Sequence, residues 1–95
     1  MTSATAIIHT TSGSRYLQQL CKHWSHKFDT AFDASQGRVA LPIGTAEMAA
    51  SPKALTVTCT APQADNLPRL EQVVADHLNR FAFREAPLQF DWRRV

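Results

Sequence analysis

Residues 17–28 read Leu-Gln-Gln-Leu-Cys-Lys-His-Trp-Ser-His-Lys-Phe, and their spacing decides the first helix of the fold. The apolar members recur three and four residues apart, which places them on one face of an α-helix. They are Leu17, Leu20, Cys21, Trp24 and Phe28. Ser12 and Ser14 flank Gly13 and offer hydroxyl groups that suit a helix start. The pattern predicts a helix that runs from this turn to about Lys27, with one face against a core.

The segments on both sides of this helix alternate with a period of two, which is typical of strands with one buried face. Upstream, Ala4 to Thr10 forms one such strand. Downstream, four sets of residues share a face and are separated by turn signals: Phe28, Thr30 and Phe32; Val39, Leu41 and Ile43; Ala46, Met48 and Ala50; Leu55, Val57, Cys59 and Ala61. We expect a meander of four short antiparallel strands.

A second helix is predicted from about Asp65 or Asn66 to about Phe83, with Pro68 in its first turn. Its apolar stripe consists of Leu67, Leu70, Val73, Val74, His77, Leu78 and Phe81. After Pro87, residues 88–92 alternate again and predict a last strand. The order β-α-β-β-β-β-α-β indicates an α+β fold, an antiparallel β-sheet with two α-helices packed on one face. Residues 1–95 are expected to form one domain.

Composition limits the classes of function. The chain has a formal net charge of +2, too small an excess to indicate nucleic-acid binding by itself. No apolar run approaches the roughly 18 residues of a membrane helix, so no membrane partner is expected. The N-terminus lacks the pattern of a signal peptide, so we expect a cytoplasmic protein whose two cysteines are reduced thiols.

Two motifs identify a family resemblance. Residues 15–17, Arg-Tyr-Leu, with residues 20–27, Leu-Cys-Lys-His-Trp-Ser-His-Lys, form the first, and residues 77–85, His-Leu-Asn-Arg-Phe-Ala-Phe-Arg-Glu, form the second. Together they resemble the bacterial family of domain of unknown function 2218. The resemblance implies no established activity. It suggests a link to iron acquisition, because such domains also occur joined to siderophore-interacting, flavin-dependent ferric reductases.

The histidines of the first motif are the leading candidates for recognition. On an ideal helix Cys21 points into the core, whereas His23 and His26 fall on the other, polar side with Lys22. The apolar stripe does not require imidazoles there, so we expect Lys22, His23 and His26 to form an exposed recognition surface. A metal site is not favoured, because zinc normally takes more than two protein ligands.

The second motif adds a buried polar group and two cations. His77 lies in the apolar stripe, where its imidazole needs a hydrogen-bond partner such as a backbone carbonyl. Arg80 and Arg84 are four residues apart near the predicted helix end. They suit the helix dipole, and they are also candidates for an anion clamp. Cys59 alternates with Val57 and is expected to be an inert core thiol.

These patterns favour a small accessory or binding domain, and the family resemblance implies a role in iron or siderophore handling. A siderophore or a flavin-dependent ferric reductase is then the candidate partner, and no cofactor is predicted. The alternative is a protein-interaction or oligomerisation module, for example a homodimer, with no small ligand. An enzyme is less favoured, because the sequence offers no nucleophile paired with a base. The outer sheet face is predicted to carry Arg38, Thr45, Glu47, Thr56, Thr58 and Thr60.

Overall fold

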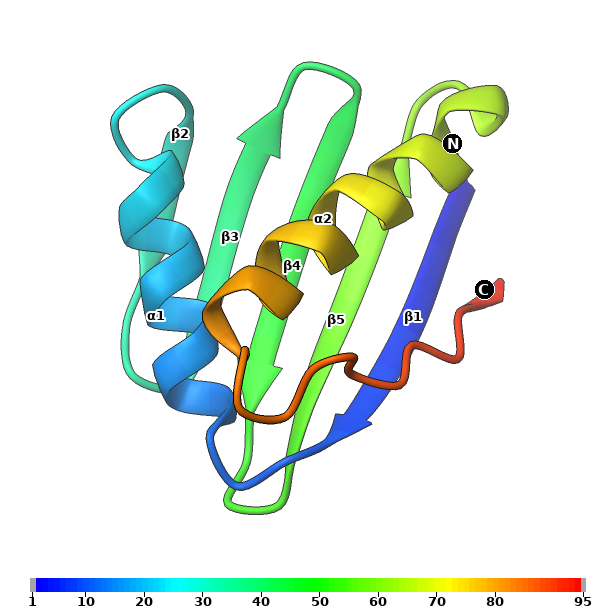
Figure 1. Ribbon diagram of the computed structural model, residues 1–95. Coiled ribbons are helices and arrows are strands. Elements are labelled where there is room, and N and C mark those ends of the chain that lie inside the picture. The colour runs from blue at the N-terminus through cyan, green and yellow to red at the C-terminus, as the bar shows by residue number, and fades with distance from the viewer. Residues whose placement is uncertain (1, 95) are drawn as a thin grey trace.

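Six strands form one antiparallel sheet, in the spatial order β2-β3-β4-β5-β1-β6, and two helices lie on one face of it (Figure 1). The computed structural model describes residues 2–94. The elements in chain order are β1 (Thr2–His9), α1 (Gly13–Trp24), β2 (Asp29–Phe32), β3 (Gln36–Leu41), β4 (Gly44–Ala50), β5 (Ala54–Ala61), the 3₁₀ turn η1 (Ala64–Asn66), α2 (Leu67–Phe81) and β6 (Arg93–Arg94). The predicted fold class and element order are confirmed.

The core lies between the sheet and the helices. Leu17, Leu20 and Cys21 of α1 are fully buried, and Trp24 is 4% exposed, as the stripe predicted. On the sheet side the buried residues are Ala4, Ala6 and Ile8 of β1, Val39, Ala46, Met48, and Leu55, Val57, Cys59 and Ala61 of β5. Figure 1 shows α2 crossing the sheet obliquely beside α1, so the two helices meet above the central strands.

The first helix ends at Trp24, three residues earlier than predicted. The backbone N–H groups of Lys27 and Phe28 both donate to the carbonyl oxygen of Trp24, at 3.0 and 2.9 Å, which closes the chain into a turn. The hydroxyl of Ser25 also donates to the carbonyl of Lys22 at 2.8 Å. A serine hydroxyl that binds a nearby carbonyl competes with the helical pattern, which helps to end the helix here.

The second helix is also shorter than predicted, and Asp65 and Asn66 belong to the 3₁₀ turn before it. Its C-terminal end is Phe81, because the chain then forms a separate turn in which Glu85 N–H donates to Ala82 O at 2.8 Å. Arg84 therefore lies in this turn rather than on the helix.

The predicted last strand over residues 88–92 is wrong, because only Arg93 and Arg94 pair with the sheet. The N–H of Leu88 donates instead to the side-chain oxygen of Asn79, at 2.8 Å, which ties this segment to α2. Phe90 and Trp92 pack as a stacked pair against the core, with ring centroids 5.7 Å apart. Their apolar faces are thus used without strand pairing.

The outer face of the sheet carries the side chains that alternation assigned to it. Arg38, Glu47 and Thr58 are direct neighbours on β3, β4 and β5. Thr58 exchanges a hydroxyl hydrogen bond with Thr5 at 3.2 Å. Phe32 was predicted to be buried, but it is 37% exposed, because no strand in residues 2–94 pairs with the outer side of β2. Within residues 2–94 no helix is long and apolar enough to span a bilayer.

Candidate functional site

A cavity of about 640 Å³ opens between the end of α1, the first half of α2 and the hairpin that joins β3 to β4. The turn after α1 contributes His26, Lys27 and Phe28. The other lining residues are His23 and Trp24 of α1, Leu41, Pro42 and Ile43 of the hairpin, and Arg69, Leu70, Val73 and His77 of α2. The cavity thus brings together three segments that are far apart in the sequence.

Aromatic rings form one wall of this cavity. The ring of His77 lies 4.9 Å from that of Trp24 and 5.6 Å from that of His23, measured between centroids. Trp24 in turn meets Phe28 edge-on at 6.3 Å. Such tilted and edge-on contacts are the arrangements that aromatic rings favour, so the rings support one another in this wall.

His77 is held by its own helix. Its Nδ1 lies 2.8 Å from the carbonyl oxygen of Val73, so the predicted bond to a backbone carbonyl is present. A carbonyl oxygen only accepts, so Nδ1 carries a proton in this arrangement. Nε2 is then the nitrogen that remains for a further partner. His77 is half-buried rather than enclosed in the core, which leaves its ring accessible from the cavity.

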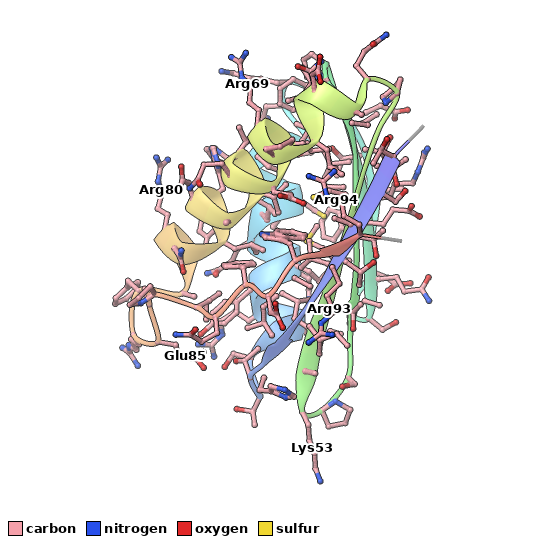
Figure 2. The ribbon with its side chains drawn as sticks, turned by 90° about the vertical axis from the view of Figure 1, so that its right-hand side faces the viewer. Lys53, Arg69, Arg80, Glu85, Arg93 and Arg94 are labelled. Atoms are coloured by element: carbon pink, nitrogen blue, oxygen red, sulfur yellow. The ribbon has the colours of Figure 1, made fainter. Side chains whose placement is uncertain are left out.

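The charged groups at the cavity all carry nitrogen. Lys27 and Arg69 carry cationic groups, and His23, His26 and His77 add imidazole nitrogens. No carboxylate is among the lining residues within 2–94. Figure 2 shows Arg69 projecting from α2 on the side away from the sheet. The cavity therefore combines apolar walls with a cationic rim.

The structure brings together some of the residues that the sequence singled out and separates others. His23 and His26 both line the cavity, together with His77. Lys22 points elsewhere, toward a shallow cleft that it shares with Gln18 and Gln19. Arg80 lies on the outer side of α2, as Figure 2 shows, and it does not line this cavity. Arg84 lines a separate cleft with Arg15 of α1.

The sequence predicted His23 on the free polar side of α1, but this placement is wrong. Its ring contacts His77 and lies 5.8 Å from Phe81, so it sits at the seam between the helices while remaining exposed. A signal for this position exists in the sequence. Tyr16, Leu20 and His23 follow one another at i, i+4 and i+7, and this flank of α1 faces α2.

Sequence reasoning missed Arg69 and the hairpin residues as parts of the site. Arg69 stands next to Pro68 in the first turn of α2, and only the crossing of the helices shows that this turn faces the end of α1. Pro42 was read as part of a reversal between strands, and Ile43 as the last apolar residue of a strand face. These residues line the cavity because of where the hairpin lies beside the helices, and the sequence does not show that position.

The two thiols do not belong to the cavity. Cys21 and Cys59 are both fully buried and unpaired with each other. Burial raises the pKa of Cys21 to about 11. Burial, with the nearby charge of Glu71, raises the pKa of Cys59 to about 12. Among residues 2–94 no group of three or more His, Cys, Asp or Glu side chains is placed to hold a metal ion.

Comparison with known proteins places this fold and its motifs in one family. Residues 5–93 match the family described as an uncharacterized protein conserved in bacteria, DUF2218. The chain belongs to the DUF2218 family. A solved structure, the NMR structure of PA4090 from Pseudomonas aeruginosa, is similar to it with a TM-score of 0.78 and 32% sequence identity. The similarity covers 100% of this chain and 96% of that one. No curated protein matches the chain.

The DUF2218 motifs have structural roles as well as a place at the cavity. The first motif supplies the buried stripe of α1, and Tyr16 within it donates a hydrogen bond to Glu85 of the second. Asn79 of the second motif holds the segment that follows α2. His23, His26 and His77 remain as motif residues with access to the cavity.

Proposed function

We propose that this DUF2218 domain is a binding protein for a small anionic molecule with an aromatic or apolar body, held in the cavity between α1, α2 and the β3–β4 hairpin. One observation carries the proposal: apolar and aromatic walls under a rim of nitrogen-bearing side chains, with no lining carboxylate in residues 2–94. Ligand sites of soluble proteins are commonly clefts of about 300–1,000 Å³ with apolar walls and a few placed polar groups.

The apolar walls of the cavity are the reason for proposing a ligand with an apolar or aromatic body. Trp24 and Phe28 offer apolar surface in the aromatic wall, and Ile43 adds apolar surface from the hairpin. Covering that surface removes it from water, which contributes roughly 25 cal/mol for each Å² buried. The tilted rings of His23 and His77 beside Trp24 add faces and edges on which a planar ring can stack.

The cationic groups at the rim of the cavity are the reason for proposing a negatively charged ligand. Arg69 of α2 can donate two parallel hydrogen bonds to a carboxylate, and Lys27 adds a point charge from the turn after α1. A cationic ligand would meet only like charges here. Binding of an isolated metal ion is disfavoured for the same reason.

Ferric siderophores belong to this chemical class when their iron-binding groups are catecholates or carboxylates. The association of the family with ferric reductases makes them the first ligands to test, and such a reductase the first protein partner. An iron or siderophore role remains a proposal that rests on that association and on the chemistry of the cavity.

Trp24 supplies a direct test, because its indole lines the cavity. Its fluorescence can be followed during titration with a ferric catecholate siderophore, the iron-free siderophore, 2,3-dihydroxybenzoate and ferric citrate. We expect saturable binding that Val73→Phe, which fills the cavity, weakens by about tenfold or more, or about 1.4 kcal/mol. Arg80→Ala is the control, since Arg80 is exposed and lies outside the cavity. Equal binding by all three proteins would reject the site.

A second candidate, self-association through the outer sheet face, has an observation of its own. Ile7 on this face is 54% exposed, and no element covers the face within residues 2–94. Arg38 and Glu47 are opposite each other and exposed, yet they form no ion pair together. A second copy related by a twofold axis can pair its Glu47 with this Arg38 and the reverse.

Sedimentation distinguishes this candidate from a monomeric binding domain. If the wild-type protein dimerises through this face, Arg38→Glu and Glu47→Arg should each weaken the dimer, and the double charge swap should restore it. A wild-type protein that sediments as a monomer at all concentrations rejects the candidate.

A further inference from the structure

A second, smaller cleft of about 150 Å³ lies between the start of α1 and the turn that follows α2. Arg15 of α1 and Arg84 of the turn both line this cleft. Tyr16, Gln19, Phe81 and Phe83 complete the lining, which contains no acidic residue within 2–94. The cleft is distinct from the larger cavity, with which it shares no lining residue.

Hydrogen bonds fix the two sides of this cleft relative to each other. The phenol of Tyr16 donates to the carboxylate of Glu85, and the hydroxyl of Thr10 donates to the same carboxylate at 3.0 Å. Figure 2 shows Glu85 in the turn beyond the end of α2. The side chain next to Arg84 is therefore tied to the helix that carries Arg15. Glu85 accepts these bonds and forms no ion pair with either guanidinium within residues 2–94.

Neither arginine has an acidic partner within residues 2–94 that would explain why both line the same cleft. Both are exposed, and neither forms an ion pair within residues 2–94. The guanidinium of Arg84 lies 5.8 Å from the ring centroid of Phe83, close enough for a cation–π contact. Phe83 itself is 72% exposed. An exposed aromatic ring thus stands beside two guanidinium groups that approach one small cleft from different elements.

We propose that Arg15 and Arg84 form an oxyanion site for a small phosphomonoester whose organic group lies against Phe83. A phosphate ester offers three acceptor oxygens, and guanidinium groups bind such oxygens through paired N–H donors. The volume of the cleft suits the phosphate and leaves the rest of the ligand outside it. That remainder then meets Phe83, whose exposed ring offers a stacking surface.

Amide NMR shifts test this site with inorganic phosphate and phenyl phosphate as probes. We expect saturable shifts in residues 15–19 and 81–85, and phenyl phosphate should bind about fivefold tighter than phosphate through stacking on Phe83. Phe83→Ala should remove that advantage without affecting inorganic phosphate. The Arg15→Gln/Arg84→Gln double variant should weaken both probes by about tenfold or more, as expected for charge-assisted bonds.

The matched control is Lys53→Gln/Arg80→Gln, which removes the same charge from exposed positions outside the cleft. Figure 2 shows Lys53 at the tip of the β4–β5 turn and Arg80 on the outer side of α2. The control should keep its affinity within about twofold, because exposed charges at a distance are screened by salt. Equal losses in both double variants would overturn the proposal in favour of diffuse charge attraction. Shifts that never saturate would overturn it as well.

Discussion

Tyr16 and Glu85 join the two family motifs through a hydrogen bond from the phenol to the carboxylate, across 69 residues of sequence. Tyr16 is 5% exposed, so its hydroxyl has few other partners. Tyr16→Phe removes the bond and should lower the free energy of unfolding by about 1–2 kcal/mol, in the range for bonds to charged groups. Urea unfolding of Tyr16→Phe, Glu85→Ala and the double variant measures the coupling. Strictly additive effects would show that the bond contributes nothing.

Trp24 is the largest side chain at the α1–α2 seam, in contact with Phe28 and His77. Trp24→Ala should destabilise the domain by about 3–5 kcal/mol, because it leaves a void in a packed layer. Lys22→Ala on the exposed side of the same helix should change stability by less than about 0.5 kcal/mol. Thermal unfolding compares the two variants, and an unchanged melting temperature for Trp24→Ala contradicts the packing described above.

Gly37 of β3 gives α1 room to approach the sheet. A Cβ at this position would lie 2.8 Å from the sulfur of Cys21 and 3.4 Å from a methyl group of Leu17. Gly37→Ala should therefore cost about 1–3 kcal/mol through overpacking. Cys21→Ala removes the atom that clashes, so in its background the same substitution should cost clearly less. Urea midpoints of the four proteins give the interaction, and an equal cost in both backgrounds contradicts this account.

The apolar periodicity predicted the fold because burial in the core is the main role of the residues that form the apolar stripes. Leu17, Leu20 and Cys21 could face nothing but a core, and all are fully buried. Phe90 and Trp92 show where this reasoning fails, since alternation reports an apolar face and does not say whether the backbone pairs with a strand. The backbone partner of Leu88 is the side chain of Asn79, and such a bond leaves no pattern in the sequence.

The candidate cavity was only partly predictable for a related reason. His23 and His26 fall outside the apolar stripe of the first helix, so the core does not explain why histidines stand there. Both line the cavity. Arg69 was not found, because it meets them only where α2 lies beside the end of α1 on the sheet. Arg84 was expected near the end of a helix predicted to reach about Phe83, but α2 ends at Phe81. Its neighbour in the cleft, Arg15, comes from α1.

The thiols should react slowly in the native protein. The pKa values of Cys21 and Cys59 are raised from 9.0 to about 11 and about 12, so both are thiols at neutral pH, and both are fully buried. Labelling by a disulfide reagent should accelerate sharply when urea is added. A pKa raised by folding contributes stability below pH 9 that is lost as the pH rises toward the folded values. Unfolding at pH 8 and pH 10.5 should therefore show an alkaline loss of stability, and Cys21→Ala should reduce it.

Binding of an anion in the larger cavity should strengthen as the pH falls. His23 and His26 face the ligand from α1 and the turn after it, with Lys27, whereas Arg69 and His77 face it from α2. The hairpin contributes no charged group to the lining. Imidazoles as a class gain charge between about pH 8 and pH 5, whereas Lys27 and Arg69 keep theirs. For a carboxylate ligand that stays ionised, affinity at pH 6 should therefore exceed that at pH 8. Added salt should weaken binding through screening of the exposed charges.

The His23→Ala/His26→Ala double variant separates this effect from a pH dependence of the ligand itself. It should bind more weakly at pH 6 and lose most of the difference between pH 6 and pH 8. Arg69→Ala should weaken binding at both pH values and keep the difference, because its charge does not change in this range. Calorimetry with 2,3-dihydroxybenzoate and a ferric siderophore provides the measurement. A double variant that retains the full pH dependence would show that the imidazoles at the end of α1 do not contact the bound anion.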